Sequence, residues 1–343
     1  MIIACVTDHQ YADMAGVLLH SIEANGQVPD ARVVVFGHDL PETDEERLRG
    51  CVEHLTLEVR DIPAAVADRI KELPSNQLFP AASSVRLLLG DLLPDDSGRV
   101  LYLDSDTLVN GSLRPLFTMQ MRGRIAAAVQ DPAHPDMQRL MNRRIGRAED
   151  AVYVNSGVLL IELGRWRHER VGERCLDWMA AHPEAALPDQ DALNVVLGGE
   201  FALLDRRWNL FTEVPGCIPA ERYSAATVVH FSGYAKPTFA ECTHPLAGEF
   251  IRLRLRTPWK DVPILTRRPH SGLLGLPARL RSRKTLDQPR SLTRAEYRAL
   301  LARAEPPQSA LQKPRADIDG ESQNGGVEQE GQDRMGKDDP AQA

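Results

Sequence analysis

The sequence has 343 residues, of which 43% are hydrophobic, so it is long enough for one large α/β domain or two modest ones. Its five cysteines lack the spacing of a disulfide framework or a zinc site, and no run of about 18 apolar residues could span a membrane. The net charge of −7 conceals a basic stretch, 252–303, with 14 basic and three acidic residues, and an acidic stretch, 304–343, with nine acidic and four basic residues.

The first 110 residues alternate between short apolar runs and amphipathic helical patterns. In chain order, the predicted strands are 2–7, 32–36, 55–59 and 100–103, and the predicted helices are 11–25, 42–52 and 82–93. Such alternation predicts an α/β fold with a mostly parallel central sheet and helices on both of its faces. The segment between 59 and 82 contains several prolines and reads as a loop.

Farther along, the predicted strands are 125–129, 158–161 and 227–229, and the predicted helices are 166–181 and 191–197. We expect one folded domain, 1–255, then a basic extension, 256–303, and an acidic tail, 304–343, which is predicted to be disordered because it has few large apolar residues. The start of the chain reads as a strand and not as a secretion signal, and the cysteines show no framework. Both features favour a cytoplasmic protein.

The predicted strand 100–103 is followed by Asp104-Ser105-Asp106. Side chains at positions i and i+2 of a strand project to the same side, so both carboxylates can approach one cation. Ligands of open α/β sheets bind at the carboxyl ends of the strands, where this pair falls. Carboxylates suit Mg²⁺ or Mn²⁺, with substrate phosphates completing the coordination. Asp-Ser-Asp is also ordinary turn chemistry, so the spacing alone leaves both interpretations open.

His230 ends the apolar run 228–229 and is followed by Phe231-Ser232-Gly233-Tyr234-Ala235-Lys236. Gly233 would allow a close backbone approach to a phosphate, and Lys236 would supply positive charge. A structural histidine followed by an ordinary loop with a solvated lysine is the alternative.

Two further polar clusters have structural and functional interpretations. Pro188-Asp189-Gln190-Asp191 opens a predicted helix, where Asp189 would serve as the N-cap. Gln190 offers both a donor and an acceptor, which suits sugar hydroxyls. Asn155-Ser156-Gly157 reads as a turn into the strand 158–161.

Three single residues complete the set of candidates. Asp8 follows the first predicted strand, where a ligand would lie. Arg86 interrupts the apolar face of its predicted helix, so it must reach a partner or extend to solvent. Asp131 follows the strand 125–129.

Taken in order, these motifs resemble glycosyltransferase family 8, which includes bacterial lipopolysaccharide galactosyl- and glucosyltransferases and the glycogenins. The resemblance covers about residues 1–255. The matching segments are 6–11, 84–87, 101–106, 154–160, 166–167, 189–194 and 229–237. It implies a single GT-A domain, which is Rossmann-like, and an enzyme that transfers galactose or glucose from a UDP-sugar.

The resemblance also implies roles for individual residues. Counterparts of Asp104, Asp106 and His230 hold Mn²⁺ in the family, with Mg²⁺ as an alternative. The implied donor contacts are uracil for Asp8 and Tyr11, phosphate for Gly233 and Lys236, the hexose for Arg86, Asp131, Asn155 and Asp189, and the anomeric carbon for Gln190. Ser156 is a further donor-binding residue. The family retains the α configuration. Because Gln190 is a poor nucleophile, same-face attack by the acceptor is favoured, with Asp131 or Asp189 as a transient nucleophile remaining open.

The acceptor is not identified, since the loops 73–81 and 132–150 that should flank it match no known pattern. A saccharide or a lipid-linked sugar is expected. Leucines among the arginines of 256–303 would suit contact with an anionic inner leaflet of the membrane, and a solvated extension is the equal alternative. Nucleic-acid binding is disfavoured, because the basic stretch has no interleaved aromatic residues.

Other function classes were compared with the transferase. A self-glycosylating protein of the glycogenin type would use Tyr223 or Tyr234 as its acceptor. A non-catalytic UDP-sugar-binding module should lack part of the metal set, which is complete here. No Gly-x-Gly-x-x-Gly follows the first strand, which excludes a dinucleotide oxidoreductase.

Overall fold

The fold is described from a computed structural model of the protein. The residues that it describes are 1–73, 81–211, 222–223, 225–232, 236–242, 244–266, 290–291 and 295–296. Gly233, Tyr234, most of the loop 73–81, most of the basic extension and the whole acidic tail lie outside the described residues. Among the described residues, no helix combines the length and the apolar character that crossing a membrane requires.

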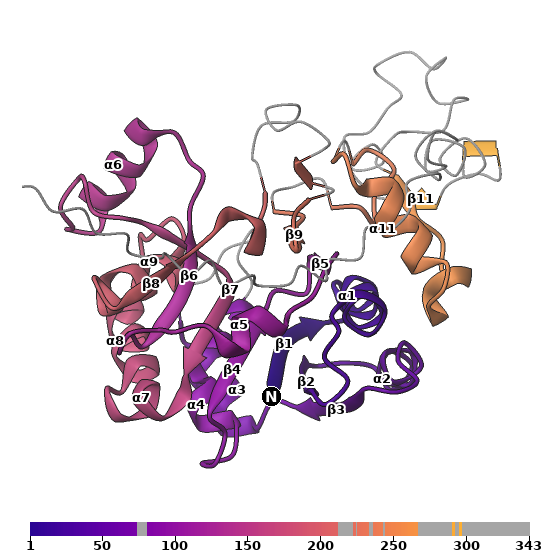
Figure 1. Cartoon of the computed structure of the whole chain (residues 1–343), viewed down its shortest axis with the longest axis horizontal. Helices are drawn as coiled ribbons and strands as arrows, with labels where there is room; N and C mark the ends of the chain where they lie inside the picture. Colours follow the sequence, from indigo (N-terminus) through magenta and orange to yellow (C-terminus); the bar gives the residue numbers. More distant parts are fainter. Residues whose placement is uncertain are drawn as a thin grey trace, which may run out of the picture. The chain divides into compact units, whose positions relative to one another are not determined.

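A seven-stranded sheet forms the centre of the fold (Figure 1). Its strands, in spatial order, are β3 (Thr56–Asp61), β2 (Arg32–His38), β1 (Ile2–Asp8), β4 (Arg99–Leu103), β7 (Val154–Glu162), β6 (Ala126–Gln130) and β8 (Phe201–Leu204). All neighbours pair in parallel except β7, which runs antiparallel to both β4 and β6. The predicted α/β fold with a mostly parallel sheet is confirmed.

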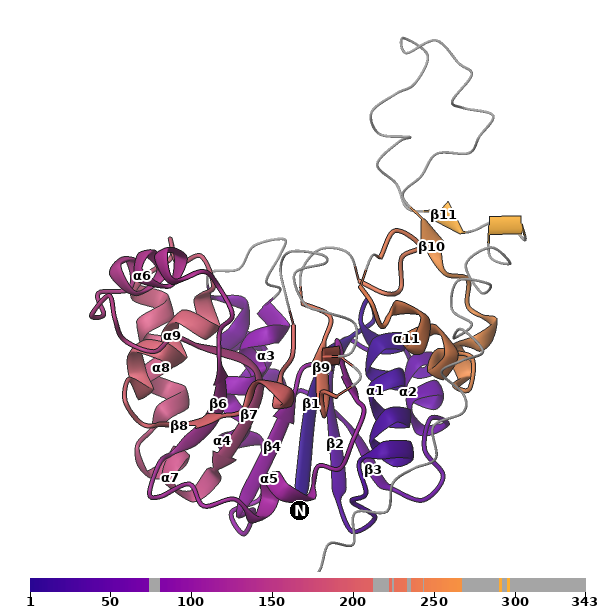
Figure 2. The ribbon, with the colours of Figure 1, turned by 45° about the horizontal axis from the view of Figure 1, so that its top comes forward.

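Helices bury both faces of this sheet, which explains why its central strands are nearly continuous apolar runs (Figure 2). In β1, Ala4 and Val6 join the core on one face, and Ile3 and Cys5 join the core on the other. The first face is covered by α3 (Ala64–Lys71), the 3₁₀ helix η1 (Ala81–Leu88), α4 (Leu89–Leu92), α7 (Leu163–His168), α8 (Val171–Ala181) and α9 (Pro188–Leu197). The second is covered by α1 (Ala12–Asn25), α2 (Glu42–Arg49) and α5 (Arg114–Thr118).

Several predicted elements differ from the observed ones. The helix predicted at 82–93 is η1 followed by α4, and the loop predicted before it contains α3. The helix predicted at 166–181 is divided into α7 and α8, because Arg170 takes the left-handed conformation with φ of 50°. Residues 155–157, predicted as a turn, lie inside β7. Their polar side chains imitate a turn, although all three residues are buried in the sheet.

A short ribbon beside the sheet brings distant parts of the chain together. Strand β5 (Thr107–Val109) pairs antiparallel with β9 (Val228–His230), and Thr107 lies opposite His230. Phe231 donates its backbone N–H to the carbonyl of Asp106 at 2.9 Å. The ribbon therefore carries His230 next to the Asp104-Ser105-Asp106 segment, more than a hundred residues away in sequence.

Helix α11 (Ala247–Arg254) packs against α1 through an apolar cluster that includes Met14, Phe231 and Phe250. A buried ion pair joins the two helices, with Arg254 Nε 3.3 Å from Asp13 Oδ2. Arg254 also donates to the carbonyl of Val262 at 3.0 Å. The remaining described elements are α6 (Pro135–Arg144), the 3₁₀ helices η2 (Arg206–Trp208) and η3 (Pro258–Asp261), and the strands β10 (Leu265–Thr266) and β11 (Arg290–Ser291).

Replacing Arg254 by methionine should lower the free energy of unfolding by about 3 kcal/mol, because Asp13 then keeps a charge that is poorly solvated and has lost its partner. Urea unfolding at neutral pH measures the change. Arg252→Met is the matched control on the same helix, since Arg252 is 44% exposed in its pair with Glu249 and should cost less than about 0.5 kcal/mol. Equal effects of the two substitutions would contradict the structural role of the buried pair.

Candidate active site

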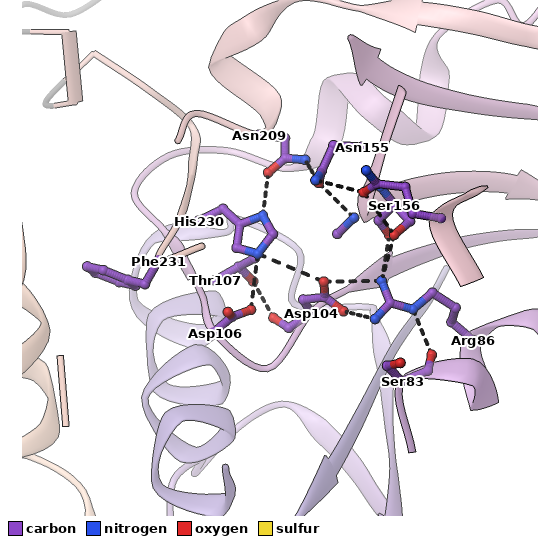
Figure 3. Close-up of polar contacts among 12 residues, drawn as sticks. Ser83, Arg86, Asp104, Asp106, Thr107, Asn155, Ser156, Asn209, His230 and Phe231 are labelled. Carbon is purple, nitrogen blue, oxygen red and sulfur yellow. Dashed lines mark hydrogen bonds and ion pairs between the residues drawn. The ribbon is translucent and has the colours of Figure 1, made fainter. Parts of the chain in front are cut away.

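Two carboxylates and one imidazole converge at the carboxyl end of β4 (Figure 3). Oxygen atoms of Asp104 and Asp106 and a ring nitrogen of His230 all lie within 4.8 Å of one another. His230 Nε2 is 3.2 Å from Asp106 Oδ1 and 3.9 Å from Asp104 Oδ2. This set of oxygen and nitrogen donors fits a divalent cation such as Mn²⁺. The structure thus brings together the three residues predicted as metal ligands.

Each carboxylate of this cluster has a cationic neighbour. Arg86 Nη2 lies 3.0 Å from Asp104 Oδ1, and Lys236 forms a close ion pair with Asp106. Burial alone would raise the pKa of Asp106, but Lys236 and His230 together outweigh it and hold the pKa well below its usual range. Burial would likewise lower the pKa of Lys236, but Asp106, Tyr11 and Asp104 together outweigh it and raise the pKa. Both groups are therefore charged at neutral pH.

Arg86 connects the carboxylates to two further segments. Its side chain is 7% exposed and donates from Nη1 to the carbonyl and the hydroxyl of Ser156, both at 3.1 Å. Its Nε lies 3.2 Å from Asp189 Oδ2. The predicted N-cap role of Asp189 is wrong, because α9 begins at Pro188 with Leu187 at the cap position and no side-chain cap. Asp189 instead compensates the buried guanidinium.

Gln190 and Asn155 form a buried pair between α9 and β7. Asn155 Nδ2 donates to Gln190 Oε1 at 2.9 Å, and the backbone N–H of Ser156 donates to the same oxygen at 3.0 Å. Gln190 Nε2 donates to the Tyr153 hydroxyl at 3.4 Å, and this hydroxyl donates to Asp191 Oδ1 at 2.5 Å. The polar residues of the two motifs thus belong to one network.

The remaining predicted residues lie at the same edge of the sheet, at the ends of other strands. Asp8 ends β1 and accepts from the backbone N–H of Tyr11 at 3.1 Å. The ring of Tyr11 lies 5.9 Å from Lys236 Nζ, which connects this segment to the carboxylate cluster. Asp131 follows β6 and accepts from the backbone N–H of Ala133 at 3.0 Å. Gly233 lies outside the described residues.

Comparison with known proteins assigns the chain to a family. A family model described as "Glycosyl transferase family 8" matches residues 2–239, which is more than half of the sequence. The chain belongs to glycosyltransferase family 8. It is therefore a glycosyltransferase, and the predicted family membership is confirmed.

The chain is similar in sequence to two bacterial proteins that carry different names. It is 24% identical over 276 residues to "General stress protein A" of Bacillus subtilis, covering 76% of this chain and 95% of the relative. It is 24% identical over 268 residues to a "Lipopolysaccharide 1,2-glucosyltransferase" of Escherichia coli, covering 76% of this chain and 79% of the relative.

A solved structure supports the GT-A architecture of this family 8 chain. The galactosyltransferase LgtC, in complex with donor and acceptor sugar analogues, has a TM-score of 0.63 and 26% identity. The match covers 76% of this chain and 99% of LgtC. The predicted GT-A fold is confirmed.

Sequence reasoning missed two polar residues of the family 8 site. Asn209 is 1% exposed and lies 3.0 Å, through Oδ1, from His230 Nδ1. Tyr102 donates its hydroxyl to Asp104 Oδ1 at 2.7 Å, and Arg86 lies over its ring. Tyr102 stands in an apolar strand and reads as core, and Asn209 follows a short η2 turn. In the sequence, Asn209 is marked only by its position between two large apolar residues, Trp208 and Leu210, both of which are buried in the structure.

Gly157 allows the cluster to close. A Cβ on Gly157 would lie 2.4 Å from His230 Cε1 and 2.9 Å from Asp104 Oδ2. These contacts are shorter than side chains tolerate, so the absence of a side chain here lets the imidazole and the carboxylate approach each other.

Substituting Gly157 by alanine should displace His230 or Asp104, lower the free energy of unfolding by about 1–3 kcal/mol and abolish binding of a divalent cation. Thermal unfolding with and without Mn²⁺ measures both effects, because a bound cation raises the melting temperature of the wild type. Gly164→Ala is the control, since a Cβ there meets nothing within 4 Å. A Gly157→Ala variant that keeps the full Mn²⁺ response would refute this interpretation of the close approach.

Proposed function

We propose that this chain is a retaining, Mn²⁺-dependent glycosyltransferase that moves a hexose, galactose or glucose, from a UDP-sugar to a saccharide or lipid-linked acceptor. The observation that carries the proposal is the convergence of Asp104, Asp106 and His230 within 4.8 Å in a chain of family 8. A divalent cation held by these three residues would supply Lewis-acid stabilisation of the negative charge on the departing diphosphate.

In this proposal, different side chains around the metal cluster bind different parts of the UDP-sugar. Lys236 carries a full positive charge beside Asp106 and would neutralise phosphate oxygens. Tyr11 offers an aromatic face near Lys236 for the uracil ring, and Asp8 offers a carboxylate at the end of β1. The nucleotide would then lie along the ends of β1 and β4, where ligands of open α/β sheets bind.

The hexose would lie on the other side of the cluster, toward Arg86, Asn155, Ser156, Asp131 and Asp189. Arg86 and Asp189 are paired, so they present a donor and an acceptor together to sugar hydroxyls. Gln190 would lie beside the anomeric carbon. Its Oε1 accepts from Asn155 and Ser156, which fixes the amide and makes it a positioned dipole and a poor nucleophile. This supports attack by the acceptor hydroxyl on the face that UDP leaves.

The proposed acceptor follows from the names of the relatives. The relatives named as lipopolysaccharide glucosyl- and galactosyltransferases favour a role in lipopolysaccharide biosynthesis, on a cytoplasmic enzyme whose basic extension contacts the inner leaflet. Self-glycosylation at Tyr223 is disfavoured, because Tyr223 is fully buried. Tyr234 lies outside the described residues.

The donor is tested by incubating the protein with Mn²⁺ and each UDP-hexose, without acceptor, and measuring UDP release. We expect slow hydrolysis of one donor, which depends on Mn²⁺ and falls at least about 100-fold in Asp106→Ala, because a charged ligand is lost from the centre that stabilises the leaving group. Asp95→Ala is the control, since this carboxylate is fully exposed and remote in its contacts from the cluster. Metal-independent hydrolysis, or equal rates in Asp106→Ala, would refute the proposed site.

The stereochemistry is tested in the same reaction. Time-resolved proton NMR of the released hexose should show the α anomer before mutarotation mixes the two forms, because same-face attack preserves the configuration of a UDP-α-hexose. The β anomer as the first product would show an inverting enzyme and would contradict the role given to Gln190.

A further inference from the structure

Asn209 belongs to a buried chain of hydrogen bonds that starts from two backbone N–H groups of β7. The backbone N–H of Gly157 donates to Asn155 Oδ1 at 2.9 Å, and the backbone N–H of Ser156 donates to Gln190 Oε1 at 3.0 Å. A backbone N–H can only donate, so the atoms that face these two groups must be oxygens. The orientations of the Asn155 and Gln190 amides are therefore determined by the backbone of β7.

The orientation of Asn209 follows from that of Asn155. The two side chains meet at 2.7 Å, between Asn209 Nδ2 and Asn155 Oδ1. Turning the Asn209 amide over would place two oxygens at this distance. Turning Asn155 as well would place its amide nitrogen against the N–H of Gly157, and its oxygen against Gln190 Oε1 at 2.9 Å. Asn209 must therefore direct its oxygen toward His230.

This oxygen decides which nitrogen of His230 carries the proton. Asn209 Oδ1 lies 3.0 Å from His230 Nδ1. An unprotonated Nδ1 would place a lone pair against another acceptor, so Nδ1 must donate. Nε2 lies 3.2 Å from Asp106 and 3.9 Å from Asp104, and with the ring proton on Nδ1 it would offer its lone pair to a cation bound between these carboxylates.

We propose that Asn209 is a positioning residue, which holds the proton of His230 on Nδ1 and so presents the Nε2 lone pair to a divalent cation between Asp104 and Asp106. The inference rests on the proposed metal-dependent transfer and adds to it a residue outside the ligand set. Partners of this kind orient metal-binding histidines and fix their tautomers. The same chain of bonds continues through Asn155 to Gln190, so the metal ligand and the residue beside the hexose are held by one set of bonds to β7.

The tautomer is tested by ¹⁵N NMR of histidine-labelled protein with UDP and diamagnetic Mg²⁺, with His230→Gln used to assign the signal. We expect a protonated Nδ1 and an unprotonated Nε2 in the wild type. In Asn209→Leu the proton should move to Nε2, because Asp106 Oδ1 then remains as an acceptor at 3.2 Å.

The affinity for the cation is measured separately, from the electron paramagnetic resonance signal of free Mn²⁺ in the presence of UDP. Asn209→Leu should bind Mn²⁺ about 10- to 100-fold more weakly than the wild type. Asn142→Leu is the matched control, since Asn142 is also fully buried and donates to the carbonyls of Glu149 and Ala151. It should lose stability and keep both the Mn²⁺ affinity and the tautomer.

The outcomes separate the inference from the proposed function. A wild-type ring protonated on Nε2, or an Asn209→Leu variant with unchanged tautomer and Mn²⁺ affinity, would overturn the role of Asn209. A wild type that binds no Mn²⁺ with UDP would instead overturn the proposed metal-dependent function. The wild-type NMR measurement decides the tautomer even where Asn209→Leu does not fold.

Discussion

The site depends on the compensation of two carboxylates that are buried two residues apart. Asp104 and Asp106 would repel each other strongly in surroundings this poorly solvated. Arg86 compensates the first from η1, and Lys236 compensates the second from the segment after β9. Since neither cation comes from the strand that carries the carboxylates, both ion pairs depend on the packing of η1 and of the β5–β9 ribbon on the sheet.

The charge compensation also reaches residues outside the metal cluster. Arg86 carries one charge and meets two carboxylates, Asp104 and Asp189, so the start of α9 is tied to the end of β4. Among the residues that the structure describes, His230 forms no ion pair with a cation, and its Nδ1 lies 3.0 Å from the neutral amide of Asn209. The hexose side of the proposed site thus combines the charged pair of Arg86 and Asp189 with the amides of Asn155 and Gln190, and both kinds of group can bind sugar hydroxyls.

Local patterns sufficed for the fold class and for most of the site. The strands β1, β2, β4 and β6 are apolar runs with clear ends, and the acidic pair follows one of them directly. The sequence could not show that Asn155, Ser156 and Gly157 lie within β7, because their composition is that of a turn. Nor could it show Asn209, whose partners His230 and Asn155 are distant in sequence and meet it only through the β5–β9 ribbon and β7. Contacts of this kind exist only in the folded chain.

The antiparallel direction of β7 determines which segment of this enzyme can change in sequence during evolution. Because β7 runs against β6, and Gln130 pairs with Val154, the chain leaves the sheet at Asp131 and re-enters it beside the same point. The excursion between Asp131 and Tyr153, residues 132–152 with α6 inside it, is therefore a closed loop on the edge where substrates are expected. Its length and sequence can change without altering the register of any strand or the spacing of the metal ligands. Selectivity for a new acceptor could therefore evolve in this excursion while the donor chemistry stays constant.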